Sequence, residues 1–303
     1  MQESTAPGSL IDVGGYRLHL DCAGNGTPAV VFEAAMWDIS LTWSLVQPEV
    51  AAFARACAYD RGGLGWSEPS PKPRTGAVMV EELRAVLRGA GIPPPYVLVA
   101  HSYGGILARM FAHRHPDEVS GMVLVDSAHE EQFLRFPEPI RMAQGPIWEQ
   151  QRAAVTGLRG LIETGSLDPA AIPAPPRLPD DVADRYRALM ATGTAVDTML
   201  AELATIEQIH AEARDSEIST LGDIPLVVIR HGEPTPPFPP ELGISEEDMG
   251  RYEEVWQELQ EELAAMSSRG RLMVAGGAGH LIHHERPGLV VDAIREVVTA
   301  VRG

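Results

Sequence analysis

A serine at position 102 has the surroundings that a catalytic nucleophile needs. It lies in the run AHSYGG at residues 100–105, between an apolar segment and a helical pattern. A sharp strand-to-helix turn strains the serine backbone, exposes its hydroxyl and requires small residues two positions before and after it. Ala100 and Gly104 meet that requirement. The run therefore predicts Ser102 as a nucleophile.

A serine hydroxyl attacks a carbonyl when a base takes its proton and an acid orients that base. The chain has ten histidines, and one candidate base is His280, which follows a strand-like segment through the glycine-rich residues 275–279. Asp126 ends the apolar segment 122–125, at 126 − 102 = 24 residues after Ser102. A carboxylate that ends a buried strand needs a partner, because an unpaired buried charge is costly. We therefore expect Asp126 to contact His280.

These side chains need a sheet that brings them to one edge. Apolar segments bounded by turn residues predict buried strands, and apolar positions at helical spacing predict helices. The predicted strands are residues 29–32, 55–59, 96–100, 122–125, 226–229 and 271–274, with an antiparallel edge strand at 16–21. The predicted helices are residues 77–91, 106–115, 180–190, 196–214, 249–266 and 288–301. This alternation is typical of the α/β class, with a mostly parallel, doubly wound central sheet.

About a hundred residues after Asp126 break the alternation of strands and helices. They contain no convincing buried strand, and their helical patterns follow a proline-rich segment at 169–179. Proline cannot continue a helix and favours extended connections. We predict a helical cap inserted at residues 128–221, on a core domain formed by residues 1–127 and 222–303.

Composition limits the partners of the chain. The 24 basic and 42 acidic residues give a net charge of −18, which repels nucleic-acid phosphates and anionic lipid surfaces. No segment approaches the roughly 18 apolar residues of a membrane span, and residues 1–8 lack the apolar centre of a signal peptide. We expect a soluble protein without nucleic-acid partners or membrane insertion, cytoplasmic unless a signal peptide has been removed from a secreted form.

The cysteines and glycines indicate no metal or cofactor. Cys22 and Cys57 are too few and too far apart for a disulfide scaffold or a metal site, and we interpret Cys57 as an inert core thiol. No metal-ligand cluster or phosphate-binding glycine loop is present in the sequence. The expected partner is a small-molecule substrate alone.

These motifs together resemble the α/β-hydrolase fold superfamily, in its cap-bearing esterase-like branch. Besides the serine turn, the resemblance depends on DRGGLGWS at 60–67, GH at 279–280 and ERP at 285–287. It implies a Ser-His-acid triad on an α/β-hydrolase core and places His280 as the triad histidine. It also implies that the aspartate and arginine of the first run shape a loop beside the active site.

Other residues are alternative candidates for the catalytic base and for the acid. His283 and His284 follow His280 closely, and we interpret both as polar residues at the surface or at a helix start. In most α/β-hydrolases the acid is an Asp just after the strand before the last, where this chain offers only Glu233. A second known placement, at the end of the strand after the nucleophile helix, fits Asp126. We favour Asp126 and keep Glu233 as the alternative acid.

Acyl transfer also needs two amide donors for the developing oxyanion. The amide of Tyr103 is expected to supply one, because it follows the nucleophile at the start of a helix. The family implies a second donor from a His-Gly loop after an early strand, where this chain reads Ala34-Ala35-Met36. A backbone amide donates whatever its side chain, so Met36 is expected to serve, with Ala35 as the alternate.

Four aromatic residues are candidates for an apolar substrate pocket, although such residues also pack in cores. They are Trp37, Phe133, Phe136 and Trp148. The expected reaction is hydrolysis of a carboxylic ester of a small, largely apolar substrate through an acyl-enzyme. The same triad serves amide, lactone and carbon–carbon bond cleavage and acyl transfer, and the fold also supports non-catalytic binding of small molecules. These alternatives stay open at the level of sequence.

Overall fold

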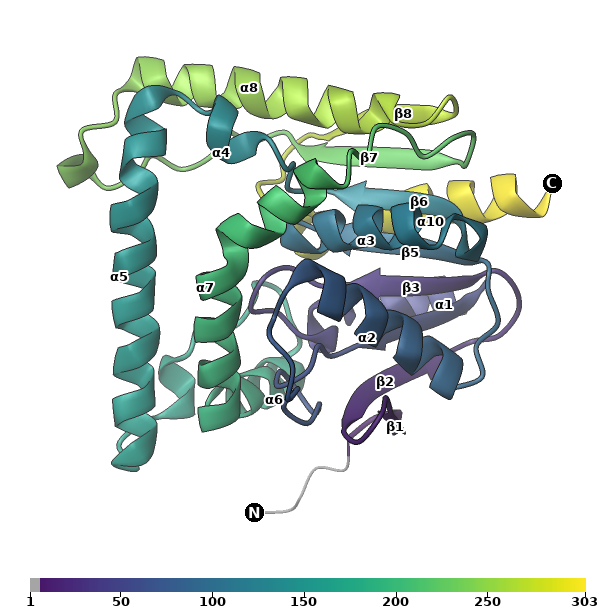
Figure 1. The fold of residues 1–303 in the computed structure, drawn as a ribbon, viewed down its shortest axis with the longest axis horizontal. Coiled ribbons are helices and arrows are strands. Elements are labelled where there is room, and N and C mark those ends of the chain that lie inside the picture. Colours follow the sequence, from purple (N-terminus) through teal and green to yellow (C-terminus); the bar gives the residue numbers. More distant parts are fainter. Residues whose placement is uncertain (1–5) are drawn as a thin grey trace.

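A mostly parallel sheet forms the centre of the molecule (Figure 1). The structure, a computed structural model, describes residues 6–303, and within them the sheet has eight strands in the order β1-β2-β4-β3-β5-β6-β7-β8. The strands are β1 Ser9–Asp12, β2 Arg17–Ala23, β3 Ala29–Glu33, β4 Arg55–Tyr59, β5 Tyr96–His101, β6 Val119–Val125, β7 Leu226–His231 and β8 Gly270–Ala275. The pairs β1–β2 and β2–β4 are antiparallel, and the other pairs are parallel.

Helices cover both faces of the sheet and bury its apolar strands. The helices are α1 Gln47–Ala51, α2 Gly76–Gly89, α3 Tyr103–Arg114, α4 Gln132–Arg135, α5 Glu138–Glu163, α6 Asp180–Met190, α7 Gly193–Asp215, α8 Glu246–Ala265, α9 Ile282–Glu285 and α10 Pro287–Arg302. One core cluster joins the sheet to α2, α3 and α8, and another joins it to α1 and α10. The doubly wound α/β class predicted from the sequence is therefore confirmed.

The sequence prediction was wrong about which strand forms the edge of the sheet. The segment predicted as an edge strand becomes β2, which lies between β1 and β4. The edge is instead β1, a short strand whose residues are mostly exposed. Its weak alternation of apolar and polar residues gave no strand signal, and its pairing with β2 supplies the stability that the local sequence lacks.

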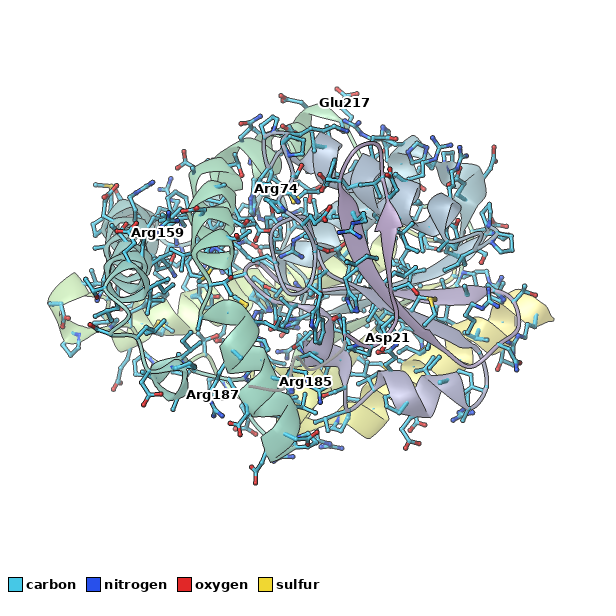
Figure 2. The ribbon with its side chains drawn as sticks, turned by 90° about the horizontal axis from the view of Figure 1, so that it is seen from below. Asp21, Arg74, Arg159, Arg185, Arg187 and Glu217 are labelled. Carbon is cyan, nitrogen blue, oxygen red and sulfur yellow. A yellow bond between two sulfur atoms is a disulfide. The ribbon has the colours of Figure 1, made fainter. Side chains whose placement is uncertain are left out.

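The segment between β6 and β7 contains α4, α5, α6 and α7 and no strand. Figure 1 shows α5 at the edge of the molecule and α7 beside it, between α5 and the helices α2 and α3. Figure 2 labels Arg159 on α5, whose guanidinium contacts the carbonyl of Gly193 and the carboxylate of Asp197 on α7. The helical character of this segment agrees with the sequence analysis. Its separation as a cap at residues 128–221, on a core of residues 1–127 and 222–303, stays a prediction.

The interpretation of Cys57 as an isolated core thiol was wrong. Cys57 on β4 is directly opposite Cys22 on β2, and the two form a disulfide. The sequence did not indicate this disulfide, because the two cysteines are far apart in the chain and only the antiparallel pairing of β2 with β4 brings them into register. The expectation for the amino-terminal residues 1–8 falls in part on residues 1–5, outside the described residues. None of the helices within residues 6–303 combines the length and apolar character of a membrane span.

Candidate active site

The sharp turn predicted around Ser102 is present between β5 and α3. Ser102 has φ 52° and ψ −123°, a left-handed conformation that non-glycine residues rarely adopt. Its amide donates to the carbonyl of Val125 at 3.1 Å. A side-chain carbon at Gly104 would lie 2.5 Å from the carbonyl oxygen of Ala34, so this position tolerates only glycine. The turn thus holds the Ser102 hydroxyl at the carboxyl edge of the sheet.

Ser102, His280 and Asp126 form a continuous chain of hydrogen-bonding side chains. Ser102 Oγ lies 3.0 Å from His280 Nε2, and His280 Nδ1 lies 2.6 Å from Asp126 Oδ2. The His280 side chain is 48% exposed and the Asp126 side chain is fully buried. Glu233, the alternative acid, is exposed, and within residues 6–303 its side chain makes no hydrogen bond to His280. The geometry therefore brings together the favoured residues and leaves Glu233 outside.

Asp126 also accepts hydrogen bonds from groups other than His280. Its Oδ1 accepts from the His231 amide at 3.0 Å and from Trp256 Nε1 at 3.0 Å. The His231 ring adds a bond from Nδ1, 2.9 Å from Oδ2. Burial opposes the charged form, but the hydrogen bonds from His231 and His280 outweigh it and lower the pKa of Asp126 well below its usual range. The carboxylate is ionised and its position is fixed from several sides.

His231 was not identified as a site residue from the sequence. It is the last residue of β7, the neighbour of β6, and its ring bridges Asp126 and Glu253 on α8. At this strand end the sequence predicted only a carboxylate, Glu233, as an alternative triad acid. A polar residue at the end of a buried strand beside the strand of Asp126 was the signal available. Trp256 and Glu253 had no comparable signal, because both lie on α8, which is far from Asp126 in the sequence.

The interpretation of His283 and His284 as surface residues was wrong. Both rings are fully buried on the short helix α9, and Thr42 Oγ1 lies 2.9 Å from His283 Nε2 and 2.8 Å from His284 Nε2. The His283 ring also packs on Trp43 and on His101, with ring centroids 4.7 Å and 4.4 Å apart. Their spacing after His280 allowed an exposed helix start, whereas the packing of α9 beneath the His280 loop buries them.

The buried histidines support the backbone that carries His280. His101 Nε2 donates to the carbonyl of His280 at 2.9 Å, and their ring centroids are 4.6 Å apart. Burial and the neighbouring His280 together lower the pKa of His101 to about 3. Burial also lowers the pKa of His283, and it lowers that of His284 to about 4. These rings are neutral near pH 7 and act as packing and hydrogen-bonding groups.

The ERP run noted in the sequence holds the loop of His280 from its other side. Glu285 Oε2 accepts the amide hydrogen of Gly279 at 2.8 Å, and the Arg286 guanidinium contacts the carbonyl of Gly276. Arg177, from the proline-rich connection, donates to the Glu285 carbonyl at 2.8 Å. The glycine-rich loop before His280 is therefore fixed by side chains that follow it in the sequence.

The predicted oxyanion donors lie on the loop after β3 and at the start of α3. Within residues 6–303 neither the Met36 amide nor the Tyr103 amide donates a hydrogen bond to the protein. Tyr103 begins α3, where helix amides lack intrahelical acceptors. Trp37, next to Met36, has φ 65°, which turns the loop sharply. Both amides are thus free to donate, and their role in binding an oxyanion stays a prediction.

Arg61 shapes this loop, as the family resemblance implied. Its guanidinium donates to the carbonyls of Ala34 at 2.9 Å and Ala35 at 2.6 Å, and pairs with Glu33 at 2.9 Å. Burial opposes the charge, but Glu202 and Glu33 outweigh it and keep the pKa of Arg61 well above its usual value. A buried cation therefore fixes the two carbonyls that precede Met36.

Glu202 on α7 completes this arrangement and was missed from the sequence. It is fully buried, and its carboxylate accepts from Arg61 Nε at 2.8 Å and from the Trp37 amide at 3.0 Å. The Trp37 indole also donates to the carbonyl of Met199 at 2.8 Å. A signal was present, because Glu202 falls on the apolar face of the helical pattern at 196–214. The inserted helices thus contact the predicted oxyanion loop directly.

The predicted substrate-binding residues are in different surroundings. Phe133 and Trp148 line a cavity of about 460 Å³ between α4, α5 and α7, and this cavity touches none of the three triad candidates. Phe136 is 5% exposed and packs with Trp256 in a separate apolar cluster. Trp37 is half-buried beside the oxyanion loop. The four residues therefore do not share one cavity, and Trp37 is the one that lies beside the predicted oxyanion loop.

Comparison with known proteins agrees with this fold. Residues 19–293 match the Alpha/beta hydrolase family. The chain is 26% identical to the uncharacterized protein YqjL of Bacillus subtilis, over 90% of this chain and 85% of YqjL. It is 34% identical to the 2-hydroxymuconate semialdehyde hydrolase of a Pseudomonas species over 130 residues, which are 42% of this chain and 46% of that hydrolase.

A solved structure shows the same fold. The chain superimposes on a thermophilic esterase from Thermogutta terrifontis with a TM-score of 0.64 and 21% identity, covering 98% of this chain and 100% of the esterase. With the family match across most of its length, the chain belongs to the Alpha/beta hydrolase family. The resemblance inferred from the sequence motifs is confirmed.

Proposed function

We propose that the protein is a serine hydrolase that cleaves a carboxylic ester through an acyl-enzyme, with Ser102, His280 and Asp126 as its triad. The single observation that supports this most is the unbroken series Ser102 Oγ to His280 Nε2 at 3.0 Å and His280 Nδ1 to Asp126 at 2.6 Å. A hydroxyl, an imidazole and a carboxylate in this order can transfer the serine proton as a nucleophile forms.

The proposed mechanism has two half-reactions. His280 removes the Ser102 proton as the oxygen attacks the ester carbonyl, and the amides of Met36 and Tyr103 stabilise the oxyanion. The resulting imidazolium protonates the leaving alcohol, and an acyl-enzyme remains. His280 then activates a water molecule that releases the acid and regenerates Ser102. The charged Asp126 holds the His280 tautomer throughout.

The substrate we propose is a small, largely apolar ester. The exposed position of His280 and the half-buried Trp37 beside the predicted oxyanion loop support access for such a molecule. The similarity to a 2-hydroxymuconate semialdehyde hydrolase supports a second candidate, hydrolysis of a carbon–carbon bond on the same triad. The two differ in the bond they cleave, so parallel assays of short-chain aryl esters and a vinylogous β-diketone separate them.

The first test is covalent labelling of Ser102. A fluorophosphonate probe should label the wild-type protein at Ser102, and Ser102→Ala should abolish the label and lower p-nitrophenyl acetate turnover by at least about 10³-fold. The matched control Ser219→Ala removes an exposed serine and should behave as wild type. Peptide mass spectrometry locates the label. Full turnover by Ser102→Ala, or a wild-type protein that neither labels nor hydrolyses esters, would overturn the proposal.

A further inference from the structure

A second imidazole binds the carboxylate that we assign as the triad acid. The His231 side chain is 5% exposed, and its Nδ1 lies 3.0 Å and 2.9 Å from the two oxygens of Asp126. Its backbone amide donates to Asp126 Oδ1 as well, at 3.0 Å. Asp126 therefore lies between two histidines, the exposed His280 and the buried His231.

The opposite nitrogen of the His231 ring faces another carboxylate. His231 Nε2 lies 2.9 Å from Glu253 Oε2, and the other oxygen of Glu253 accepts the Thr235 amide at 2.8 Å. A neutral imidazole has one N–H, whereas an imidazolium has two. Ionised carboxylates at both ring nitrogens can each receive a hydrogen bond only when His231 carries both protons.

The charges around His231 agree with this protonation state. Burial opposes it, but the hydrogen bonds to Asp126 and Glu253 outweigh burial and raise the pKa of His231 to about 9. Burial raises the pKa of Glu253, yet its bonds from His231 and Thr235 bring it below the usual value. Arg230 is the other nearby cation, and its guanidinium donates to the His231 carbonyl at 3.0 Å.

We propose that His231, held as an imidazolium by Glu253, is a positioning residue that fixes the Asp126 carboxylate and limits the proton affinity of His280. The proposal rests on the proposed function and extends it. His231 and His280 share one carboxylate oxygen, Asp126 Oδ2, so a positive charge on the first disfavours a positive charge on the second. The cation thereby keeps His280 available as a base at lower pH.

The sign of the pH effect follows from this shared carboxylate. When the His231 charge is lost, Asp126 acts on His280 alone and favours its protonated form. The acid limb of the kcat/KM profile, which reports the free enzyme's base, then moves to higher pH. A neutral residue at 231 should move it by about 0.5–1 pH unit, a size typical of the loss of one nearby charge.

Glu253→Gln tests the charge with little change of shape. The glutamine amide can donate to His231 Nε2, so the ring keeps its Nδ1 bond to Asp126 but loses its positive charge near neutral pH. Because the Glu253 charge is lost together with that of His231, the acid limb for p-nitrophenyl acetate should shift upward by less than in His231→Gln, up to about 0.5 pH unit, with the plateau kcat within about threefold of wild type. His231→Gln should shift the limb in the same direction. Glu254→Gln, an exposed charge on the same helix, is the matched control and should leave the profile unchanged.

Nitrogen-15 NMR of labelled histidine side chains gives a readout that does not need catalysis. His231, assigned by its loss in His231→Gln, should show imidazolium signals up to about pH 8 in the wild type and neutral signals at pH 8 in Glu253→Gln. Neutral His231 at pH 7 in the wild type, or an unmoved acid limb in both active variants, would overturn the inference. A wild-type protein without esterase activity or labelling would instead overturn the proposed function, and the NMR spectra would still decide the protonation of His231.

Discussion

The Asp126 carboxylate has no exposed surface and is nevertheless held in its ionised form. Unpaired, such a charge would be costly, because the protein interior solvates it poorly. Here His280, His231 and Trp256 all donate to it. Its backbone has φ 42°, so the chain turns sharply where β6 ends and directs the carboxylate toward β7. The acid is therefore fixed by its own backbone and by neighbours on other elements.

Substitution of the two carboxylates distinguishes them as triad acids. Asp126→Asn should lower kcat for p-nitrophenyl acetate by about 10²–10⁴-fold, because an amide neither stabilises the His280 imidazolium nor selects the required tautomer. Glu233→Gln is the matched control, since its side chain is exposed, and should retain kcat within about twofold. Steady-state kinetics at pH 8 measures both variants. Equal losses in the two, or a larger loss for Glu233→Gln, would contradict the assignment to Asp126.

For single residues, the sequence predicted those roles that depend on residues adjacent in the chain. The serine turn depends on small neighbours that are adjacent in the chain, and the observed φ of Ser102 agrees with it. The partners of Asp126 come from β7, α8 and the loop after β8, which only the folded sheet brings together. The contacts of His231 and Glu253 around Asp126 therefore depend on the tertiary structure and not on local sequence. The burial of His283 and His284 likewise depends on Thr42 and Trp43, from a distant part of the chain.

At the scale of elements, α7 is joined to the loop that carries the predicted oxyanion donor. Glu202 on α7 accepts from both Arg61 and the Trp37 amide, while Thr205 donates to the carbonyl of Arg74 at 2.8 Å. Figure 2 labels Arg74 beside this helix. A displacement of α7 would therefore move the backbone on either side of Met36. The helix α7 and the loop after β3 are therefore connected by buried hydrogen bonds and an ion pair through Arg61.

Glu202→Gln should reduce kcat more than it raises KM. The loss of the carboxylate leaves the Arg61 charge partly unpaired and loosens the Met36 amide, whose proposed contact with the oxyanion would strengthen in the transition state. We expect kcat to fall about 10–100-fold, and the free energy of unfolding to fall by about 3–5 kcal/mol, as for a broken buried ion pair. Steady-state kinetics and urea unfolding measure these effects, at a temperature where circular dichroism shows the variant folded.

Asp197→Asn provides the control on the same helix. Its carboxylate pairs with Arg159 at the exposed side of α7, so kcat and stability should stay close to wild type, the latter within about 1 kcal/mol. A folded Glu202→Gln protein with wild-type kcat would show that the oxyanion loop does not depend on α7. An equal effect in both variants would show that the change comes from the loss of any one negative charge on α7.

Most elements were predictable because their apolar patterns are strong, and the exceptions have physical causes. α5 spans Glu138–Glu163 although Pro146 lies inside it, and proline removes a helical hydrogen bond. Packing of α5 against α7 outweighs that cost, which local sequence does not reveal. β1 is short and exposed, and it depends on β2 for its pairing. The formation of both elements therefore depends on tertiary contacts.

At the scale of the whole molecule, the order of strands determines which distant residues meet. β2 enters the sheet antiparallel beside β4, and this pairing alone places Cys22 opposite Cys57. The same strand order places β6 between β5 and β7, so Ser102, Asp126 and His231 emerge from three adjacent strands. Alternation of strands and helices predicted a doubly wound sheet, but it did not specify the register that produced the disulfide.

Reduction of the Cys22–Cys57 disulfide should lower stability without altering the catalytic chemistry. The bond closes a loop between residues 35 positions apart, and the loss of chain entropy for a loop of that size corresponds to about 4 kcal/mol. Neither cysteine is a hydrogen-bond partner of Ser102, His280 or Asp126. Urea unfolding with and without reductant should show a lower midpoint for the reduced protein, with kcat unchanged while it stays folded.

The double variant Cys22→Ser, Cys57→Ala controls for effects of the reductant, because it should match the reduced wild type and ignore added reductant. Thiol titration of the denatured wild-type protein should find no free thiol before reduction and two after it. Two reactive thiols in oxidised protein, or unfolding midpoints that coincide with and without reductant, would show that β2 and β4 are joined only by their hydrogen-bonded pairing. The disulfide would then contribute nothing to the stability of the sheet that positions the triad.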